Sequence, residues 1–344
     1  MKTILFLANA GPEVGLGHLN RCRVLALSLV NMKASCIMIG PSISYKNKED
    51  FIIFDDWYEL GSTLNEDALL NSFIKIKNKI KFSRIVIDDY RAKSAFQKYL
   101  FNKGYKWLQF DIAENKPLWS NWIHNASPSA NRKDYVSSLM SRNQIMFLGP
   151  EYALLHPKYF NSFNSKVEHR DFKKIFVSFG GGNDHGAITF LLNSVHNNRN
   201  DIHFEIVSSK INQSNDRIKK KIISKWRDKA KFYIDPGNIN DIMINCDFCI
   251  IGGGTMTFEA AKCGLPMIII TIANNQIKQA QGWDGIGAAK YIGDLKSVKG
   301  SELRKIIQHY LSQKKLNKIR KILSEIQFKG ADYISKAILY DKHN

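Results

Sequence analysis

The sequence alternates short apolar runs with segments of helical periodicity, and this alternation constrains the fold more than any other feature. In the first half, each apolar run predicts a strand and the intervening segments predict helices. Strands that alternate with helices are typical of a doubly wound parallel sheet in an α/β fold. The expected strands are residues 3–8, 34–39, 51–54, 84–87, 107–110, 122–124 and 145–148, and the expected helices are residues 21–31, 66–81 and 94–102.

The same alternation restarts beyond a polar stretch at residues 161–170, which we interpret as an interdomain linker. A chain of 344 residues is longer than one typical domain, so two domains are expected, residues 1–160 and 171–344. Residues 301–341 predict two or three basic amphipathic helices. The strands expected in the second half are residues 174–178, 203–207, 231–234, 248–251 and 267–271.

A glycine loop that carries a histidine follows the first apolar run. Gly15, Gly17, His18 and Arg21 belong to this loop and to the start of the next helix. Glycines let the backbone approach a bulky anion, and a helix start offers unpaired N–H donors. His18 adds a group that can accept a proton near neutral pH, and Arg21, one helical turn on, can face the same ligand. We interpret the loop as a reaction centre for a phosphate-bearing substrate. The alternative is a simple turn and helix cap, because the loop matches neither the dinucleotide motif nor the P-loop motif.

Two further glycine loops follow apolar runs in the second half, at the sheet edge where α/β proteins bind ligands. One of them leads through Gly254 and Thr255 into a helix that bears Glu259. Backbone donors at that helix start can hold a diphosphate, and Glu259 can accept hydrogen bonds from a ribose diol. The alternative is that Glu259 is a carboxylate favoured there by the helix dipole. The other loop consists of Gly180, Gly181 and Gly182.

The formal net charge is +19, yet the distribution of the basic residues argues against a nucleic-acid partner. Lysines gather in residues 217–221 and 314–321, which are typical of solvated helix faces. No basic motif interleaved with aromatic residues accompanies them. A general attraction to anionic substrates or to an anionic membrane surface is compatible with this charge.

Hydropathy and cysteine usage favour a cytoplasmic protein. No apolar stretch reaches the ~20 residues of a membrane helix, and the sequence begins on an expected strand rather than on a leader. We therefore expect no integral membrane segment. The five cysteines are scattered, which favours reduced thiols. Cys246 and Cys249 have the spacing of a metal or redox pair, but without a second pair we expect buried structural thiols. The sequence carries no signal for an oligomeric state.

Several short motifs, taken in order, resemble a known enzyme family. By these motifs the chain resembles the nucleotide-sugar hydrolases of pseudaminic acid biosynthesis, and more distantly the two-domain glycosyltransferases of the GT-B fold. These hydrolases remove UDP from UDP-2,4-diacetamido-2,4,6-trideoxy-beta-L-altropyranose. The resemblance implies two Rossmann-type domains facing across a cleft, a last helix that returns to the first domain, and a role in surface polysaccharide synthesis or flagellin glycosylation. The motifs are residues 15–21, 87–90, 149–155, 179–182, 257–261 and 275–276.

The resemblance also implies roles for individual residues. His18 would be the general base that activates water for attack at the anomeric carbon. Tyr90 would lie in the active-site cleft, with Asp88 at the preceding strand end. Glu259 would hold the ribose of UDP. The implied chemistry needs neither a metal nor a cofactor, and the sequence contains no D-x-D motif to seat a divalent ion. The residues implied to contact the diphosphate or the sugar are Asn275 and Gln276.

The chain departs from the family pattern around the sugar half of the implied site. Asp88-Asp89-Tyr90-Arg91 stands where the family usually has Asp-His-Tyr-Gly, so an imidazole is lost and an acid and a guanidinium are gained. The usual acidic pair appears as Asp111-Ile112, and His156 replaces a common arginine. Asn183 and Asp184 compete for the aspartate position after the glycines. The nucleotide half matches better, which favours nucleotide-sugar binding over any particular sugar.

Two other functions fit the same motifs. A glycosyltransferase on this scaffold would use an acceptor hydroxyl in place of water, and it would need the same base and the same UDP pocket. A non-catalytic nucleotide-sugar-binding protein is the second alternative, because Asp89 and Ile112 alter the family pattern near the implied base.

Overall fold

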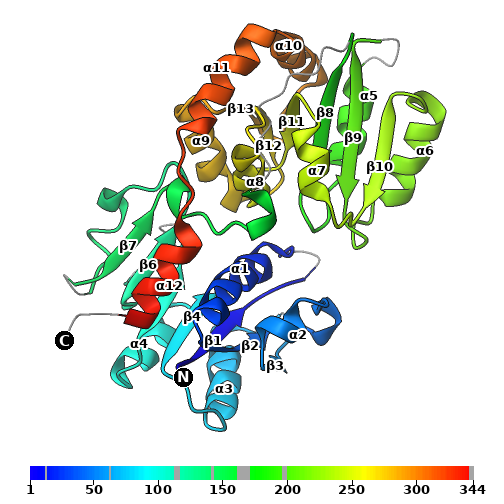
Figure 1. Ribbon diagram of the computed structural model, residues 1–344. Coiled ribbons are helices and arrows are strands. Elements are labelled where there is room, and N and C mark those ends of the chain that lie inside the picture. The colour runs from blue at the N-terminus through cyan, green and yellow to red at the C-terminus, as the bar shows by residue number, and fades with distance from the viewer. Residues whose placement is uncertain are drawn as a thin grey trace. The chain divides into compact units, whose positions relative to one another are not determined.

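The computed structural model describes residues 1–11, 14–61, 63–111, 117–140, 143–160, 171–195 and 200–340. It divides into two compact units, each built around one sheet (Figure 1). Unit 1 consists of Met1–Leu155 and Phe328–Asn344, and unit 2 consists of His156–Gln327. The chain therefore passes between the units twice. The expected linker at 161–170 lies outside the described residues.

The sheet of unit 1 has the strand order β3-β2-β1-β4-β5-β6-β7, and every neighbouring pair is parallel. The order reverses between β1 and β4, and in such sheets ligands bind beyond the carboxyl ends of the strands at this reversal. The strands are β1 Thr3–Ala8, β2 Ser35–Gly40, β3 Asp56–Glu59, β4 Arg84–Asp88, β5 Trp107–Phe110, β6 Trp122–Asn125 and β7 Ile145–Leu148.

Helices cover both faces of this sheet, because successive strand residues point to opposite faces. Ile4 and Phe6 pack in one core cluster with α1 and α12, while Leu5 and Leu7 pack in the other with α3 and α4. The helices of unit 1 are α1 Gly17–Asn31, α2 Asp50–Ile53, α3 Glu66–Lys77, α4 Ser94–Asn102 and α12 Gly330–Tyr340, with single 3-10 turns η1 Ile43–Tyr45, η2 Arg132–Asp134 and η3 Pro150–Tyr152.

The last helix, α12, belongs to unit 1 although it follows unit 2 in the sequence. Ile334, Ile338 and Leu339 are buried in the same cluster as α1. Directly before α12, the Lys329 amide donates a hydrogen bond to the Glu151 carbonyl at 2.8 Å, so this segment is bound to unit 1 where the helix begins. A Cβ on Gly330 would collide with the Tyr152 backbone, so only glycine lets the helix start this close.

Unit 2 repeats the architecture with the order β10-β9-β8-β11-β12-β13, again with parallel neighbours. Its strands are β8 Lys173–Ser178, β9 Ile202–Ser208, β10 Ala230–Ile234, β11 Phe248–Ile251, β12 Met267–Thr271 and β13 Ala289–Asp294. Its helices are α5 Ala187–Ser194, α6 Asn215–Lys225, α7 Ile239–Ile244, α8 Met256–Lys262, α9 Ile277–Gly285, α10 Gly300–Tyr310 and α11 Gln313–Ser324, with 3-10 turns η4 Pro157–Tyr159 and η5 Asn274–Gln276.

Two doubly wound parallel sheets confirm the predicted fold class, but one expected strand is wrong. Residues 51–54 are not a strand, because Asp50–Ile53 form the short helix α2 and the strand is β3. The Asn47 side chain accepts from the Glu49 and Asp50 amides at 2.9 and 3.0 Å and so caps a helical turn. Strand β13 was not predicted, and α1 begins at Gly17 rather than at residue 21.

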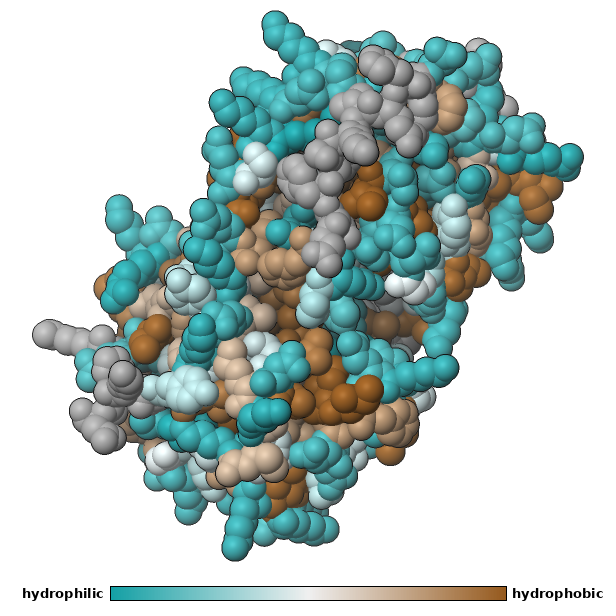
Figure 2. All heavy atoms as spheres, in the orientation of Figure 1, coloured by the Kyte–Doolittle hydropathy of each residue, from teal (hydrophilic) through white to brown (hydrophobic). Residues whose placement is uncertain are grey.

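The lysine-rich segments are exposed helix faces, as predicted. Helix α6 buries only Ile218 and Ile222, and α11 buries its apolar stripe and exposes its lysines. Hydrophilic side chains are spread over the face in Figure 2. Within the described ranges, no helix is both long and apolar enough to span a bilayer. All five cysteines are described and buried, and none forms a disulfide.

Candidate active site

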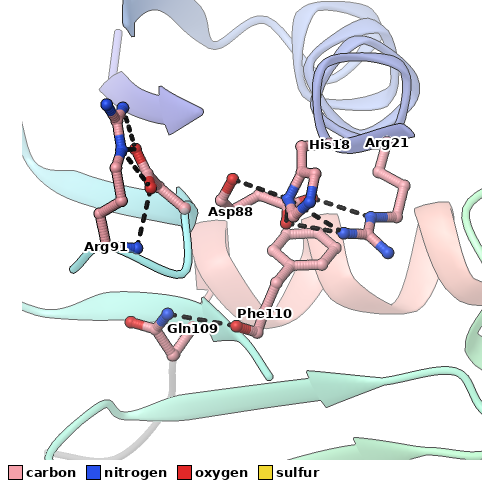
Figure 3. Close-up of polar contacts among 7 residues, drawn as sticks. His18, Arg21, Asp88, Arg91, Gln109 and Phe110 are labelled. Carbon is pink, nitrogen blue, oxygen red and sulfur yellow. Dashed lines mark hydrogen bonds and ion pairs between the residues drawn. The ribbon is translucent and has the colours of Figure 1, made fainter. Parts of the chain in front are cut away.

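His18 lies in the first turn of α1 and faces the end of β4 (Figure 3). Its Nδ1 is 2.6 Å from Asp88 Oδ1 and 3.1 Å from the Asp88 carbonyl oxygen. Because both are acceptors, Nδ1 carries the proton and donates it to Asp88. This tautomer leaves Nε2 with a lone pair, and no residue in the described ranges hydrogen-bonds to Nε2. The imidazole is therefore oriented as a base.

Arg21 binds the same carboxylate from one helical turn further along α1. Its Nε donates to Asp88 Oδ2 at 2.8 Å and its Nη2 donates to Oδ1 at 2.7 Å, which is a bidentate pair. Asp88 is fully buried. Burial alone would raise the pKa of Asp88, but the charges of Arg21 and His18 lower it to about 2. The carboxylate is therefore ionised at neutral pH.

Aromatic rings surround this pair. The Tyr90 ring meets His18 edge to face, with centroids 4.7 Å apart. The Arg21 guanidinium lies 5.3 Å from the centroid of the Phe110 ring, and Phe110 packs on His124. Burial lowers the pKa of His124 to about 4, so this second histidine is neutral and donates from Nε2 to the Tyr152 carbonyl at 2.8 Å.

Asp89 and Arg91, the two residues beside Tyr90 that depart from the family pattern, form an ion pair with each other. Asp89 is buried and accepts from Arg91 Nη2 at 2.7 Å and from Arg91 Nε at 2.9 Å. Arg91 Nη1 also donates to the Gly61 carbonyl at 2.7 Å. In Figure 3, Arg91 lies apart from the His18, Arg21 and Asp88 group. The acid and the guanidinium gained at these positions therefore neutralise each other. Ile112 lies outside the described residues.

The first glycine loop closes on itself through Gly15. The Gly15 amide donates to the Gly11 carbonyl at 2.7 Å, and Gly15 has φ +75°, which glycine adopts without strain. The Gly15 N–H is therefore already hydrogen-bonded within the loop. The amides of Gly17 and His18, in the first turn of α1, have no backbone partner among the described residues. The amides of Gly17 and His18 are therefore among the donors that the loop can offer a ligand.

Two glutamines hold the glycine loop of unit 2. Gln276 Oε1 accepts from the amides of Gly253 and Ile272, each at 3.1 Å. Gln279 Nε2 donates to the carbonyls of Gly253 and Gly254 at 2.9 and 2.7 Å. Because a trans peptide points its N–H opposite to its C=O, these bonds turn the amides of Gly254 and Thr255 away from α9. Those two amides have no partner among the described residues.

Glu259 is partly buried on α8. Burial is the main influence and raises its pKa to about 7, against the opposing effects of a hydrogen bond from Tyr159 and the charge of Lys158. The carboxyl group is thus partly protonated at neutral pH. Tyr159 and Lys158 belong to η4, directly after the chain enters unit 2.

The other residues of unit 2 that the sequence singles out differ in their exposure and in their hydrogen bonds. Asn275 is exposed, and no hydrogen bond engages it within the described residues. Gly180, Gly181 and Gly182 follow β8 and are partly exposed. Asp184 is buried and accepts from the Gly186 and Ile188 amides at 3.1 and 3.0 Å, so it caps α5. Asn183 is the more exposed of the two candidates for the aspartate position. His156 Nδ1 accepts from the Lys158 amide at 3.3 Å.

Sequence reasoning named His18, Arg21 and Asp88 but did not predict their mutual contacts, and it missed Phe110 and Gln279. The spacing of Gln276 and Gln279 is a signal for one helix face. Among the described His, Cys, Asp and Glu residues, no group of three could hold a metal ion.

No family model matches the chain, but three curated proteins are similar to it. An uncharacterised protein of Methanocaldococcus jannaschii is 23% identical over 275 residues, which cover 78% of this chain and 55% of that protein. The UDP-2,4-diacetamido-2,4,6-trideoxy-beta-L-altropyranose hydrolase of Campylobacter jejuni is 25% identical, covering 79% of this chain and 93% of the relative. The spore coat polysaccharide biosynthesis protein SpsG of Bacillus subtilis is 22% identical, covering 83% and 82%. The resemblance indicated by the motifs is thereby confirmed.

Solved structures identify the fold as GT-B. MurG of Acinetobacter baumannii superposes with a TM-score of 0.68 at 12% identity, covering 98% of this chain and 99% of that chain. WaaG, a glycosyltransferase involved in lipopolysaccharide biosynthesis, gives 0.62 at 10% identity, covering 98% and 100%. The rhamnosyltransferase SpnG, solved with thymidine diphosphate, gives 0.68 at 10% identity, covering 97% and 99%. At these identities the similarity establishes the fold.

Proposed function

We propose that this protein is a UDP-sugar hydrolase that releases UDP from UDP-2,4-diacetamido-2,4,6-trideoxy-beta-L-altropyranose or a similar UDP-deoxyamino sugar. The observation that carries the proposal is the His18–Asp88 contact of 2.6 Å, which holds Nδ1 on the carboxylate and leaves Nε2 without a hydrogen-bond partner among the described residues. The similarity to the Campylobacter jejuni hydrolase supports the choice of reaction. The proposed pathway for the product is the biosynthesis of pseudaminic acid.

In the proposed reaction, His18 Nε2 accepts a proton from a water molecule as the water oxygen attacks the anomeric carbon. The bond between that carbon and the glycosidic oxygen breaks, and UDP leaves with the electron pair. Asp88 holds the ring in the tautomer that leaves Nε2 basic, as the aspartate of a catalytic triad does. Tyr90 limits the ring's rotation through its edge-to-face contact.

Unit 2 is proposed to bind the nucleotide. The outward amides of Gly254 and Thr255, together with the side-chain amide of Gln276, would donate to the diphosphate, and preorganised donors of this kind stabilise developing charge. The amides that follow β8, at Gly180, Gly181 and Gly182, would add further donors. Glu259 would accept from the ribose hydroxyls, and the exposed Asn275 would contact the diphosphate or the sugar.

The test is UDP release from a panel of UDP-deoxyamino sugars in ¹⁸O-labelled water, without any acceptor. Attack at the anomeric carbon puts the label in the free sugar, whereas attack at phosphorus puts it in UDP. His18→Ala is expected to lower turnover by at least ~100-fold with little change in UDP affinity. His309→Ala, an exposed histidine on α10, is the matched control and is expected to keep full turnover. Normal turnover in His18→Ala would remove His18 from the mechanism.

A glycosyltransferase is the second candidate, favoured by the GT-B neighbours WaaG and SpnG. It would place an acceptor hydroxyl where the hydrolase places water. Sugar release that is slow alone and accelerates at least ~100-fold with an acceptor sugar would favour this alternative. Rapid stoichiometric release without acceptor favours the hydrolase.

A further inference from the structure

The Asp88 carboxylate is shared unequally between His18 and Arg21. The guanidinium binds both oxygens, with Nε at 2.8 Å from Oδ2 and Nη2 at 2.7 Å from Oδ1. The imidazole reaches only Oδ1, which therefore accepts from two donors. In a catalytic triad the buried aspartate accepts the Nδ1–H of the histidine and stabilises its imidazolium. Here a permanent cation already neutralises the aspartate.

We propose that Arg21 is a positioning residue that acts through Asp88, holding the carboxylate neutralised so that His18 remains an uncharged base, and that it is not a ligand of the substrate. The role of His18 as a base rests on the proposed function. The charge balance among His18, Arg21 and Asp88 does not depend on that function.

The buried group formed by His18, Arg21 and Asp88 has two charge states, which differ in the protonation of His18. With a neutral imidazole, Asp88 and Arg21 balance each other. Protonating His18 would place a second cation 3.4 Å from Arg21, as measured between Nδ1 and Nη2, and like charges this close disfavour the charged form. Without Arg21, the buried carboxylate would face only the imidazole, and an isolated buried carboxylate strongly favours a protonated partner.

The other titratable groups around His18 do not supply a charge that could take the place of Arg21 beside Asp88. On α1, burial raises the pKa of Cys22 well above its usual value, so the thiol is neutral. Tyr90 is also neutral because burial raises its pKa, even though Arg21 opposes the shift. On β6, His124 is uncharged above its pKa of about 4. The charged groups are the Asp89–Arg91 pair in the β4 loop, the Arg23–Asp50 pair, and Asp111, which follows β5 and acts electrostatically on Tyr90.

The test is a nitrogen-15 NMR titration of the histidine side chains in the full-length, unliganded protein. A His18→Gln spectrum assigns the His18 signals among those of the nine histidines. In the wild type, the neutral imidazole is expected to carry its proton on Nδ1. In Arg21→Gln, the titration midpoint of His18 is expected to rise by at least ~1 pH unit. The acid limb of the pH profile of UDP release is expected to move by the same amount.

Arg23→Gln is the matched control, because Arg23 lies on the same helix and binds Asp50 through the same two-point geometry, at 2.8 and 2.6 Å. It is expected to destabilise the protein and leave the His18 midpoint in place. A midpoint in Arg21→Gln within ~0.3 pH units of the wild type would overturn the proposal. If Arg21→Gln does not fold, Arg21→Met, which keeps an unbranched side chain without the charge, is titrated in its place, with the same expected rise and the same result that overturns the proposal.

The two proposals fail separately. Full turnover in His18→Ala removes the proposed function, whatever the titration shows. An unmoved midpoint with an essential His18 removes only the role given to Arg21. UDP affinity adds a third readout, because a substrate ligand would lose affinity in Arg21→Gln at every pH, whereas the proposal expects little change.

Discussion

Replacing Asp88 with asparagine separates the two roles of this carboxylate, which orients His18 and stabilises unit 1. The carboxylate is fully buried and accepts three short hydrogen bonds from His18 and Arg21. Burial raises its pKa, but the two partners lower it to about 2, below the ordinary 3.8. A depressed pKa of this size corresponds to about 2 kcal/mol of stability, present above pH ~4 and lost as the pH falls towards ~2.

Asp88→Asn is expected to lower the free energy of unfolding at pH 7 by about 2 kcal/mol, measured by urea denaturation, with the deficit shrinking as the pH falls below ~4. Turnover is expected to fall by ~10²–10⁴, because the amide can present an N–H to Nδ1 and so favour the wrong tautomer. Steady-state UDP release and the ring-nitrogen shifts of His18 measure this second effect.

Asp50→Asn is the control for Asp88→Asn. Asp50 is also buried and bound at two points by an arginine of α1, but no histidine in the described part of the chain hydrogen-bonds to it. It is expected to destabilise the protein and to leave turnover unchanged. If Asp88→Asn keeps turnover within about threefold of the wild type, the carboxylate does not orient the base and the reasoning is wrong.

Two further changes test unit 2. Gly253→Ala would put a Cβ 2.9 Å from the Gln276 carbonyl oxygen, so we expect a loss of about 1–3 kcal/mol in thermal or urea unfolding. Gly254→Ala, whose Cβ would meet nothing nearer than 3.9 Å, should cost less, and equal losses would contradict the packing argument. For Glu259→Gln, the raised pKa of about 7 means that ionisation costs the wild type stability as the pH rises from about 4.5 to 7. The variant should therefore be more stable than the wild type at pH 8, by up to about 3 kcal/mol, and parallel stability profiles of the two proteins against pH would refute the raised pKa. The variant should also bind UDP more weakly by calorimetry, and an unchanged affinity would refute the ribose contact.

The fold was predictable because its strands are buried on both faces and so read as continuous apolar runs. The error at residues 51–54 has the same origin. Phe51, Ile52 and Ile53 form an apolar run, yet Phe51 and Ile52 are exposed and only Ile53 is buried. A run this short does not distinguish a strand from a helical turn, and the deciding residue was the capping Asn47.

The candidate site was predictable in its residue types but not in its pairings. His18 and Asp88 are far apart in the sequence, and their contact follows from β1 and β4 being neighbours in the sheet. The Asp89–Arg91 pair is local, but the sequence does not show that both side chains turn towards each other and towards Gly61. Gln279 was not predicted because it binds the backbone carbonyls of the glycine loop, and a motif of side chains does not show such contacts.

The position of α12 has a consequence for how the chain folds during synthesis. Unit 2 is contiguous and can form once residue 327 has left the ribosome, while the first 155 residues still lack the helix that covers one face of their sheet. The N-terminal part, although made first, is thus completed last, the reverse of the usual order. A nascent chain arrested before Gly330 would leave the cluster beside α1 open to water, a state that a chaperone would recognise.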